Sequence, residues 1–284
     1  STEGLHALAT RCAAMARAVP EDRYCGLPDA SELATGELDM DLTGEPEISA
    51  ETLESESLAA EAAALAVKGI KTVAGCGASW NRSSRWVAAS NGFAAYKTGT
   101  STSLGLASVA EKDGAMERDY ESWSVRHTAD RPTAEQIGRT AGERTIARLG
   151  ARKLETQKAA VLYDRRVSSG LIGALMSAIS GPSIARGVSF LKDSMDTQVF
   201  AKGVNVIDDP FRPMGMGSRS HDGEGLPVKE TYLIEDGRLT EWLLNGPSAR
   251  QLGLKPNGFS ALGFGDPPGV TTSNLYLQAG EKTP

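Results

Sequence analysis

The sequence contains few of the side chains that most often bind metals or act as nucleophiles. Its 284 residues include only three histidines and three cysteines. Three cysteines cannot all pair within one chain, and their spacing fits no zinc-binding pattern, so a disulfide-rich or cysteine-rich zinc scaffold is excluded. We expect reduced thiols, as in a cytoplasmic protein. The residues concerned are His6, His127, His221, Cys12, Cys25 and Cys76.

An excess of basic charge and long hydrophobic runs are also missing. The chain carries 30 Lys and Arg against 36 Asp and Glu, a net charge of −6, which argues against direct nucleic-acid binding. The longest uncharged run, residues 167–185, is interrupted by Pro182 and several serines, so it is too polar to cross a membrane. The chain begins at Ser1 without a basic leader, and we expect no signal peptide.

The first part of the sequence has the pattern of two helices followed by antiparallel strands. Alanine-rich segments at residues 3–19 and 50–68 predict helices, the second one capped by Ser49. Asn91-Gly92 and Asp113-Gly114 are strong hairpin signals within a region rich in Ser, Thr, Trp and Tyr. We therefore expect a meander of four strands, at residues 72–81, 84–90, 93–110 and 115–125.

One run in this meander, residues 98–103, consists only of hydroxyl residues and glycine. Such a run has no large apolar side chain to bury, so it could form an exposed sheet edge to which an extended peptide adds as a further strand. The alternative is an interior strand that is already paired on both sides. The sequence leaves both interpretations open.

The second part begins with a helix that a Thr133–Gln136 capping box opens and Gly150 ends. A short strand is expected at residues 159–163, and a further helix at about 169–180. In that helix Gly173, Ala174 and Ser177 fall on one face and large apolar residues on the other. We expect it to be buried on both faces, so that a large residue at 173 would overpack it.

The last third returns to strands, at residues 204–207, 228–234 and 239–244, with Asp236-Gly237 as a hairpin turn. Helices and strands are segregated along the chain rather than alternating, which favours an α+β fold. We expect helices plus an antiparallel β meander in residues 1–130. Residues 131–284 should form a C-terminal domain, a β-rich body around a buried helix.

Known catalytic motifs are missing: there is neither a G-x-S-x-G elbow nor a phosphate-binding loop. One cluster of polar residues remains. It could be a metal or substrate site, but Asp-Asp-Pro and Asp-Gly-Glu-Gly also have the composition of structural turns. The cluster comprises Asp208, Asp209, His221, Asp222 and Glu224.

Several segments together resemble one known family, TldD/PmbA, whose members are also known as modulators of DNA gyrase. The resemblance is most specific between residues 130 and 275. The segments are PTAEQIGRTA at 132–141, the region 159–181, SFLKD at 189–193, IDDP at 207–210, DGEG at 222–225, the hairpin at 236–237 and SARQLG at 248–253.

The resemblance implies a two-subunit peptidase. The TldD-type subunit carries an H-E-x-x-x-H zinc motif on the helix at 169–180, whereas the PmbA-type subunit, also called TldE, lacks it. Here that segment contains neither His nor Glu, so the chain resembles the PmbA/TldE type. We expect no cofactor in this chain and zinc only in a TldD-like partner. The segment reads Gly173, Ala174, Leu175, Met176, Ser177, Ala178, Ile179 and Ser180.

By this resemblance we expect the non-catalytic subunit of a cytoplasmic heterodimeric metallopeptidase, which matures precursor peptides and degrades unfolded ones. Two alternatives stay open: a homodimeric peptide-binding protein without peptidase activity, and a self-sufficient metal-dependent hydrolase using the acidic cluster. Family members are longer, so the resemblance also implies that N-terminal and C-terminal parts are missing from this chain.

Overall fold

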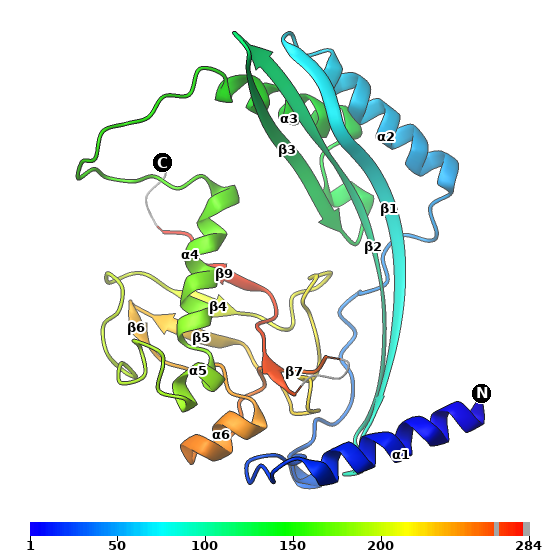
Figure 1. Cartoon of the computed structure of the whole chain (residues 1–284), viewed down its shortest axis with the longest axis vertical. Coiled ribbons are helices and arrows are strands. Elements are labelled where there is room, and N and C mark those ends of the chain that lie inside the picture. Colours follow the sequence, from blue (N-terminus) through cyan, green and yellow to red (C-terminus); the bar gives the residue numbers. More distant parts are fainter. Residues whose placement is uncertain (264–266, 281–284) are drawn as a thin grey trace.

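The computed structural model describes residues 1–263 and 267–280 and confirms the α+β fold. A three-stranded antiparallel sheet with two covering helices forms one half, and a β-rich body forms the other (Figure 1). Two of its three strands are very long and run down beside the second half (Figure 1). Their far end therefore brings together residues that are distant in sequence.

The first sheet has the order β1-β2-β3, with β1 at Ile70–Ala88, β2 at Ala94–Lys112 and β3 at Ala115–Val125. The expected break between residues 81 and 84 is wrong, because Arg82 and Ser83 pair in register with Thr100 and Gly99. Both hairpin turns are confirmed. Each contains a positive-φ glycine, Gly92 or Gly114, which adopts that conformation at no steric cost.

Two helices, α2 at Ala50–Leu65 and α3 at Ala134–Arg148, pack against this sheet and against each other. The expected caps are present, since Ser49 accepts from Thr52 N and Thr133 forms a capping box with Gln136. The boundary that we placed at residue 130 falls between β3 and α3, two elements that are in contact. The core between the two helices and the sheet comprises Ala60, Ala64, Leu104, Leu106, Ala134, Ile137 and Ala141.

The hydroxyl-rich run of β2 is flanked on both sides at its C-terminal end. Thr102 and Ser103 lie between β1 and β3. Thr100 pairs with β1, and its N–H donates to Leu42 O on the other side. An open edge over the whole run is therefore wrong, because the chain itself occupies that edge from residue 100 onward.

The C-terminal body contains a four-stranded antiparallel sheet of order β6-β5-β4-β9. The expected Asp236-Gly237 turn joins β5 to β6 and is confirmed, with both residues at positive φ. The strands are β4 at Val206–Asp208, β5 at Thr231–Glu235, β6 at Arg238–Leu239 and β9 at Leu275–Leu277; β7 at Ser260–Ala261 and β8 at Gly269–Val270 form a separate pair.

Three helices accompany this body: α4 at Arg165–Ala178, α5 at Gly181–Ala185 and α6 at Gly246–Leu252. Burial of α4 on both faces is wrong. Its apolar side packs through Leu175 and Ala178 into the core, followed by Ile179 at its C-terminal end. On the small-residue side, Gly173 and Ala174 are exposed. A Cβ at position 173 would meet no atom within 4 Å, so a large residue there would not overpack.

The connection between the two halves contains no strand at residues 159–163, contrary to our expectation. Val161 and Leu162 are exposed, at 68% and 99%, and no described strand lies alongside to pair with them. The apolar and β-branched composition of residues 159–163 was not enough to predict a strand, because a strand also needs a neighbour that pairs with its main-chain groups.

At the N-terminus, α1 at Thr2–Ala18 has no buried residue. The chain then passes the single-turn helix η1 at Ala30–Glu32 and runs between the hairpin and the C-terminal body; a second such turn, η2 at Thr128–Asp130, follows β3. Hydrogen bonds attach this segment to the body, including Ala34 N to Gly225 O and Leu38 N to Ser220 Oγ. Within the described ranges, no helix combines the length and apolar character needed to cross a membrane.

Candidate functional site

The carboxylates of the predicted acidic cluster accept hydrogen bonds from main-chain N–H groups. Asp208, the last residue of β4, is 2% exposed and accepts from Ser273 N at 2.7 Å. Burial raises the pKa of this carboxyl group, while the Ser273 hydrogen bonds and the Arg219 charge act in the opposite direction. Its neighbour Asp209 accepts from Phe211 N at 2.9 Å, which forms an Asx turn around Pro210.

Asp222 organises the next turn. Its Oδ1 accepts from Glu224 N at 2.9 Å and Leu226 N at 3.0 Å, and its Oδ2 accepts from Ser260 N at 3.1 Å. The side chain is 2% exposed. Burial raises the pKa of this carboxyl group, and the hydrogen bonds from the three N–H groups offset only part of that rise. Asp222 thus connects the turn to β7.

Glu224 and His221 complete the predicted set. Glu224 Oε2 accepts from Gly246 N at 2.8 Å, at the first residue of α6. The His221 ring packs edge-on against Phe93 at 4.9 Å between centroids, and its Nδ1 lies 2.8 Å from Asp222 O. Because a carbonyl accepts, Nδ1 carries a proton in this arrangement.

Four of the five residues thus accept hydrogen bonds from main-chain N–H groups of turns, loops or a helix start, whereas His221 packs against Phe93. Residues 1–263 and 267–280 contain no group of three or more His, Cys, Asp or Glu side chains placed to hold a metal ion. A role for the five residues in a substrate groove stays a prediction.

The helix segment at 173–180 does not fit a zinc site either. Ala174, Leu175 and Ile179 have no side-chain nitrogen, oxygen or sulfur to bind a metal. The two histidines of an H-E-x-x-x-H motif are five residues apart, as are Ala174 and Ile179 here. On a regular α-helix, with about 100° per residue, two such side chains point about 140° away from each other. In agreement, Ala174 is exposed while Ile179 is fully buried.

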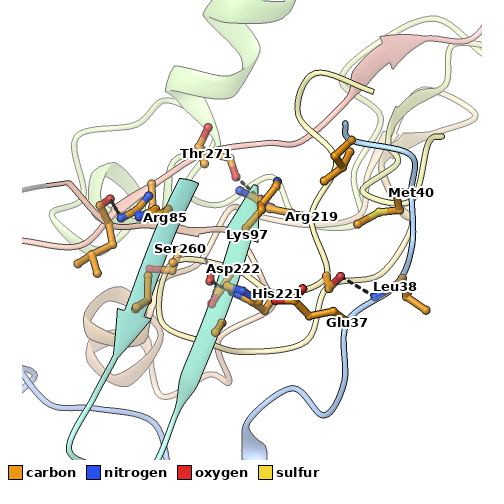
Figure 2. A pocket seen from close by; sticks show the side chains of 17 residues that line it. Glu37, Leu38, Met40, Arg85, Lys97, Arg219, His221, Asp222, Ser260 and Thr271 are labelled. Carbon is orange, nitrogen blue, oxygen red and sulfur yellow. Dashed lines mark hydrogen bonds between the residues drawn. The ribbon is translucent and has the colours of Figure 1, made fainter. Parts of the chain in front are cut away.

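A cavity of about 250 Å³ lies at the far end of the β1–β2 hairpin (Figure 2). Two of the predicted groove or turn residues, His221 and Asp222, line it, whereas sequence reasoning missed its other walls. Three parts of the chain form its walls. The hairpin contributes one face, on which the cross-strand pairs Arg85–Lys97 and Val87–Ala95 lie. The N-terminal segment contributes Glu37, Leu38, Met40 and Leu42, and the C-terminal body contributes residues 219–223, 260–262 and Thr271.

Positively charged groups lie on one side of this cavity. Lys97 donates to Ser218 O at 2.5 Å, and Arg219, the next residue, donates to Thr271 O at 3.0 Å. Burial lowers the pKa of Lys97, and the nearby charges of Arg126 and Arg219 lower it further. Burial also lowers the pKa of Arg219, which Asp208 and Asp222 partly offset. No local motif marks Lys97 or Arg219, because 122 residues separate them in sequence.

Arg126, directly after β3, ties these parts together. Its guanidinium is 7% exposed and donates to Leu42 O at 2.9 Å, Thr100 O at 2.8 Å and Gly215 O at 3.2 Å. One side chain thus bridges the N-terminal segment, β2 and a loop of the C-terminal body. This bridge positions the hairpin beside the body and so shapes the cavity.

Comparison with protein families gives two matches that together span most of the chain. A model described as the PmbA/TldA metallopeptidase central domain matches residues 44–149, and the corresponding C-terminal domain model matches residues 156–284. Metalloprotease PmbA from Escherichia coli O157:H7 is 36% identical over 245 residues, covering 86% of this chain and 54% of that protein. A metalloprotease from Methanothermobacter thermautotrophicus is 35% identical over 153 residues, covering 54% of this chain and 34% of that protein.

Solved structures show the same fold. A protein described as a modulator of DNA gyrase from Bacteroides thetaiotaomicron superposes with a TM-score of 0.89 at 21% identity, covering 99% of this chain and 62% of that one. TldE from Thermococcus kodakarensis superposes with a TM-score of 0.73 at 19% identity, covering 95% of this chain and 61% of that one. The chain thus spans about half to two thirds of the length of these proteins.

Proposed function

This chain belongs to the PmbA/TldD metallopeptidase family, and from this premise we propose that it is the non-catalytic subunit of a TldD/TldE-type heterodimer. The pair would act in the cytoplasm on precursor peptides and unfolded peptides. In it, this chain would complete the substrate groove and hold the catalytic partner in a competent shape. Zinc would be bound by the partner.

One observation carries this proposal. By the family resemblance, α4 corresponds to the helix on which TldD-type subunits carry their zinc motif, but residues 173–180 here contain no His, Cys, Asp or Glu. Its small-residue side, with Gly170, Gly173, Ala174 and Ser177, is exposed. A retained helix without ligands, with one open side of small residues, is suited to lie close against a second surface.

The alternative of a self-sufficient hydrolase finds less support. Such an enzyme would need carboxylates or imidazoles that converge on one point with unused lone pairs. Asp208, Asp222 and Glu224 instead accept hydrogen bonds from Ser273 N, Ser260 N and Gly246 N. Among the described residues no three His, Cys, Asp or Glu side chains converge to hold a metal ion.

A pull-down tests the proposal. The tagged chain is incubated with cytosol of its native organism, bound proteins are identified, and peptidase activity on an unfolded peptide is measured with and without them. We expect a partner with an H-E-x-x-x-H motif, and zinc-dependent activity that needs both proteins. Recovery of the chain only as a homodimer, or peptidase activity of the chain alone, would contradict the proposal.

A matched pair of variants sharpens the test. Gly173→Leu places a large side chain on the open side of α4, where a Cβ meets no atom within 4 Å. It should leave the fold intact and lower partner binding and joint activity at least about 10-fold. Gly75→Leu, in β1 and equally unobstructed, is the control and should leave both unchanged. Equal binding and activity in the two variants would place the partner elsewhere.

A further inference from the structure

Two polar side-chain atoms that lie on the cavity-lining residues lack a hydrogen-bond partner among the described residues. They are the hydroxyl oxygen of Ser260 and the Nε of Arg219, both buried from solvent. Ser260 is 0% exposed. A buried polar group left without a partner costs about 1–3 kcal/mol. Because both atoms are closed off from solvent while the cavity is open to it, a ligand in the cavity meets the other nitrogens of Arg219 and the Lys97 amine.

The side of the cavity that Lys97 and Arg219 form is positively charged. Lys97 and Arg219 form no ion pair with a carboxylate of the described residues. Both side chains donate to main-chain carbonyls, Lys97 to Ser218 O and Arg219 to Gly258 O and Thr271 O. Burial and the neighbouring cations lower the pKa of Lys97, so an anion nearby would relieve an existing repulsion.

Part of the remaining wall is apolar. This part consists of Leu38, Met40 and Leu42 from the N-terminal segment, together with Val87 and Ala95 from the hairpin. Leu38 is 57% exposed and follows the exposed Glu37, so this edge of the cavity is open to solvent. A ligand can therefore enter beside Leu38 with an apolar group against this wall.

We propose that this cavity binds a carboxylate attached to an apolar group, namely the C-terminal carboxylate of a peptide whose last side chain is apolar. The carboxylate receives hydrogen bonds from the Lys97 amine and the Arg219 guanidinium, and the last side chain packs against Leu38 and Val87. The anion site rests on the cavity itself, whereas the choice of a peptide as its source rests on the proposed function.

The lining also distinguishes a carboxylate from a phosphate. Glu37 and Asp222 line the same cavity, and their negative charges disfavour a dianion more than a monoanion. The volume of about 250 Å³ is below that of most drug-sized sites, so it holds the end of a peptide rather than a long segment. The rest of the peptide extends outward past Glu37.

Calorimetric titration of the 284-residue chain tests the site without any partner. The probes are a pentapeptide with a free C-terminal leucine, the same peptide as its C-terminal amide, N-acetyl-leucine, and inorganic phosphate. We expect the free-acid peptide to bind at least about 10-fold more tightly than the amide. N-acetyl-leucine binding as tightly as the peptide would assign the site to small free acids and overturn the peptide source. Phosphate binding most tightly, equal binding of acid and amide, or no binding of any probe would overturn the carboxylate site.

Three variants locate the binding. Lys97→Met should lower affinity for the free acid at least about 10-fold. Ser260→Ala removes a buried hydroxyl that has no partner among the described residues, so thermal stability should stay equal or rise and affinity should stay unchanged. Lys202→Met, at an exposed lysine that does not line the cavity, should also leave affinity unchanged. If Lys97→Met binds the free acid like the parent protein, the ligand lies elsewhere and the proposal is wrong. These results do not depend on the pull-down, so either proposal can fail alone.

Discussion

Glu224 and Gly246 are joined by a hydrogen bond of 2.8 Å, from the main-chain nitrogen that begins α6 to the carboxylate of the DGEG turn. An N–H group at the start of a helix has no partner within the helix, so a buried one depends on such an acceptor. The finding assigns to Glu224 a role in stability.

Replacement of Glu224 should separate this role from a catalytic one. Glu224→Gln keeps an oxygen that can accept from Gly246 N, so the free energy of unfolding should change by less than about 0.5 kcal/mol. Glu224→Leu leaves that N–H buried and unpaired and should cost about 1–3 kcal/mol. Urea denaturation of the two variants measures the difference. An equal loss in both would show that the charge, rather than the acceptor, matters.

The contact between α2 and α3 depends on the absence of a side chain at Gly138. A Cβ at this position would overlap the main-chain carbonyl of Ala60, which belongs to a packed helix and cannot move away easily. Gly138→Ala should therefore lower the free energy of unfolding by about 1–3 kcal/mol. Gly173→Ala in α4, where the position is open, should raise it by about 0.5–1 kcal/mol, because alanine is the better helix former. Thermal denaturation should show a lower melting temperature for Gly138→Ala and a higher one for Gly173→Ala than for the parent protein.

Asp119 in β3 and Arg166 in α4 form an ion pair of 2.9 Å that links the two halves. Burial alone would raise the pKa of Asp119, but the Arg166 guanidinium and Tyr120 N–H outweigh it and hold the pKa below its usual value. The pair therefore adds stability above about pH 3.9, and this is lost as the pH falls through the lowered pKa. Arg166→Met should flatten the acid limb of the stability curve. An unchanged acid limb in this variant would contradict the assignment.

Asp222 should show the opposite dependence. Burial raises its pKa, so the folded protein binds this proton more tightly than the unfolded chain does. Its contribution to the free energy of unfolding therefore falls as the pH rises from about 3.9 through the raised pKa. Asp222→Asn removes this dependence, and it costs about 1–3 kcal/mol because one of three main-chain N–H groups loses its acceptor. Asp209→Asn, which keeps the single acceptor for Phe211 N, should be nearly neutral in the same pH series.

The features that the sequence could predict are those decided within a few residues. Asn91-Gly92, Asp113-Gly114 and Asp236-Gly237 need left-handed backbone conformations, and few residue types supply them cheaply. The caps at Ser49 and Thr133 are equally local. The segregation of helices and strands along the chain indicated the α+β fold, and the order of the family motifs indicated the family.

The features that the sequence could not predict depend on contacts between distant segments. The open side of α4 has the same small residues that a closely packed helix would have, so periodicity alone cannot tell the two apart. The cavity arises because Arg126 bridges Leu42, Thr100 and Gly215. No pattern near any of these residues indicates that they meet. The sequence could not decide between a structural turn and a metal site at Asp222 and Glu224. Both residues suit either role until their hydrogen-bond partners are known.

The length of the β1–β2 hairpin has a mechanical consequence. Each strand contains 19 residues, so at about 3.3 Å per residue the ribbon is about 60 Å long. Arg126 holds β2 at Thr100, and the six residues from there back to Ala94 extend about 20 Å beyond this bridge. A tilt of about 5° about the bridge would therefore move the tip of the hairpin, and with it one wall of the cavity, by about 2 Å.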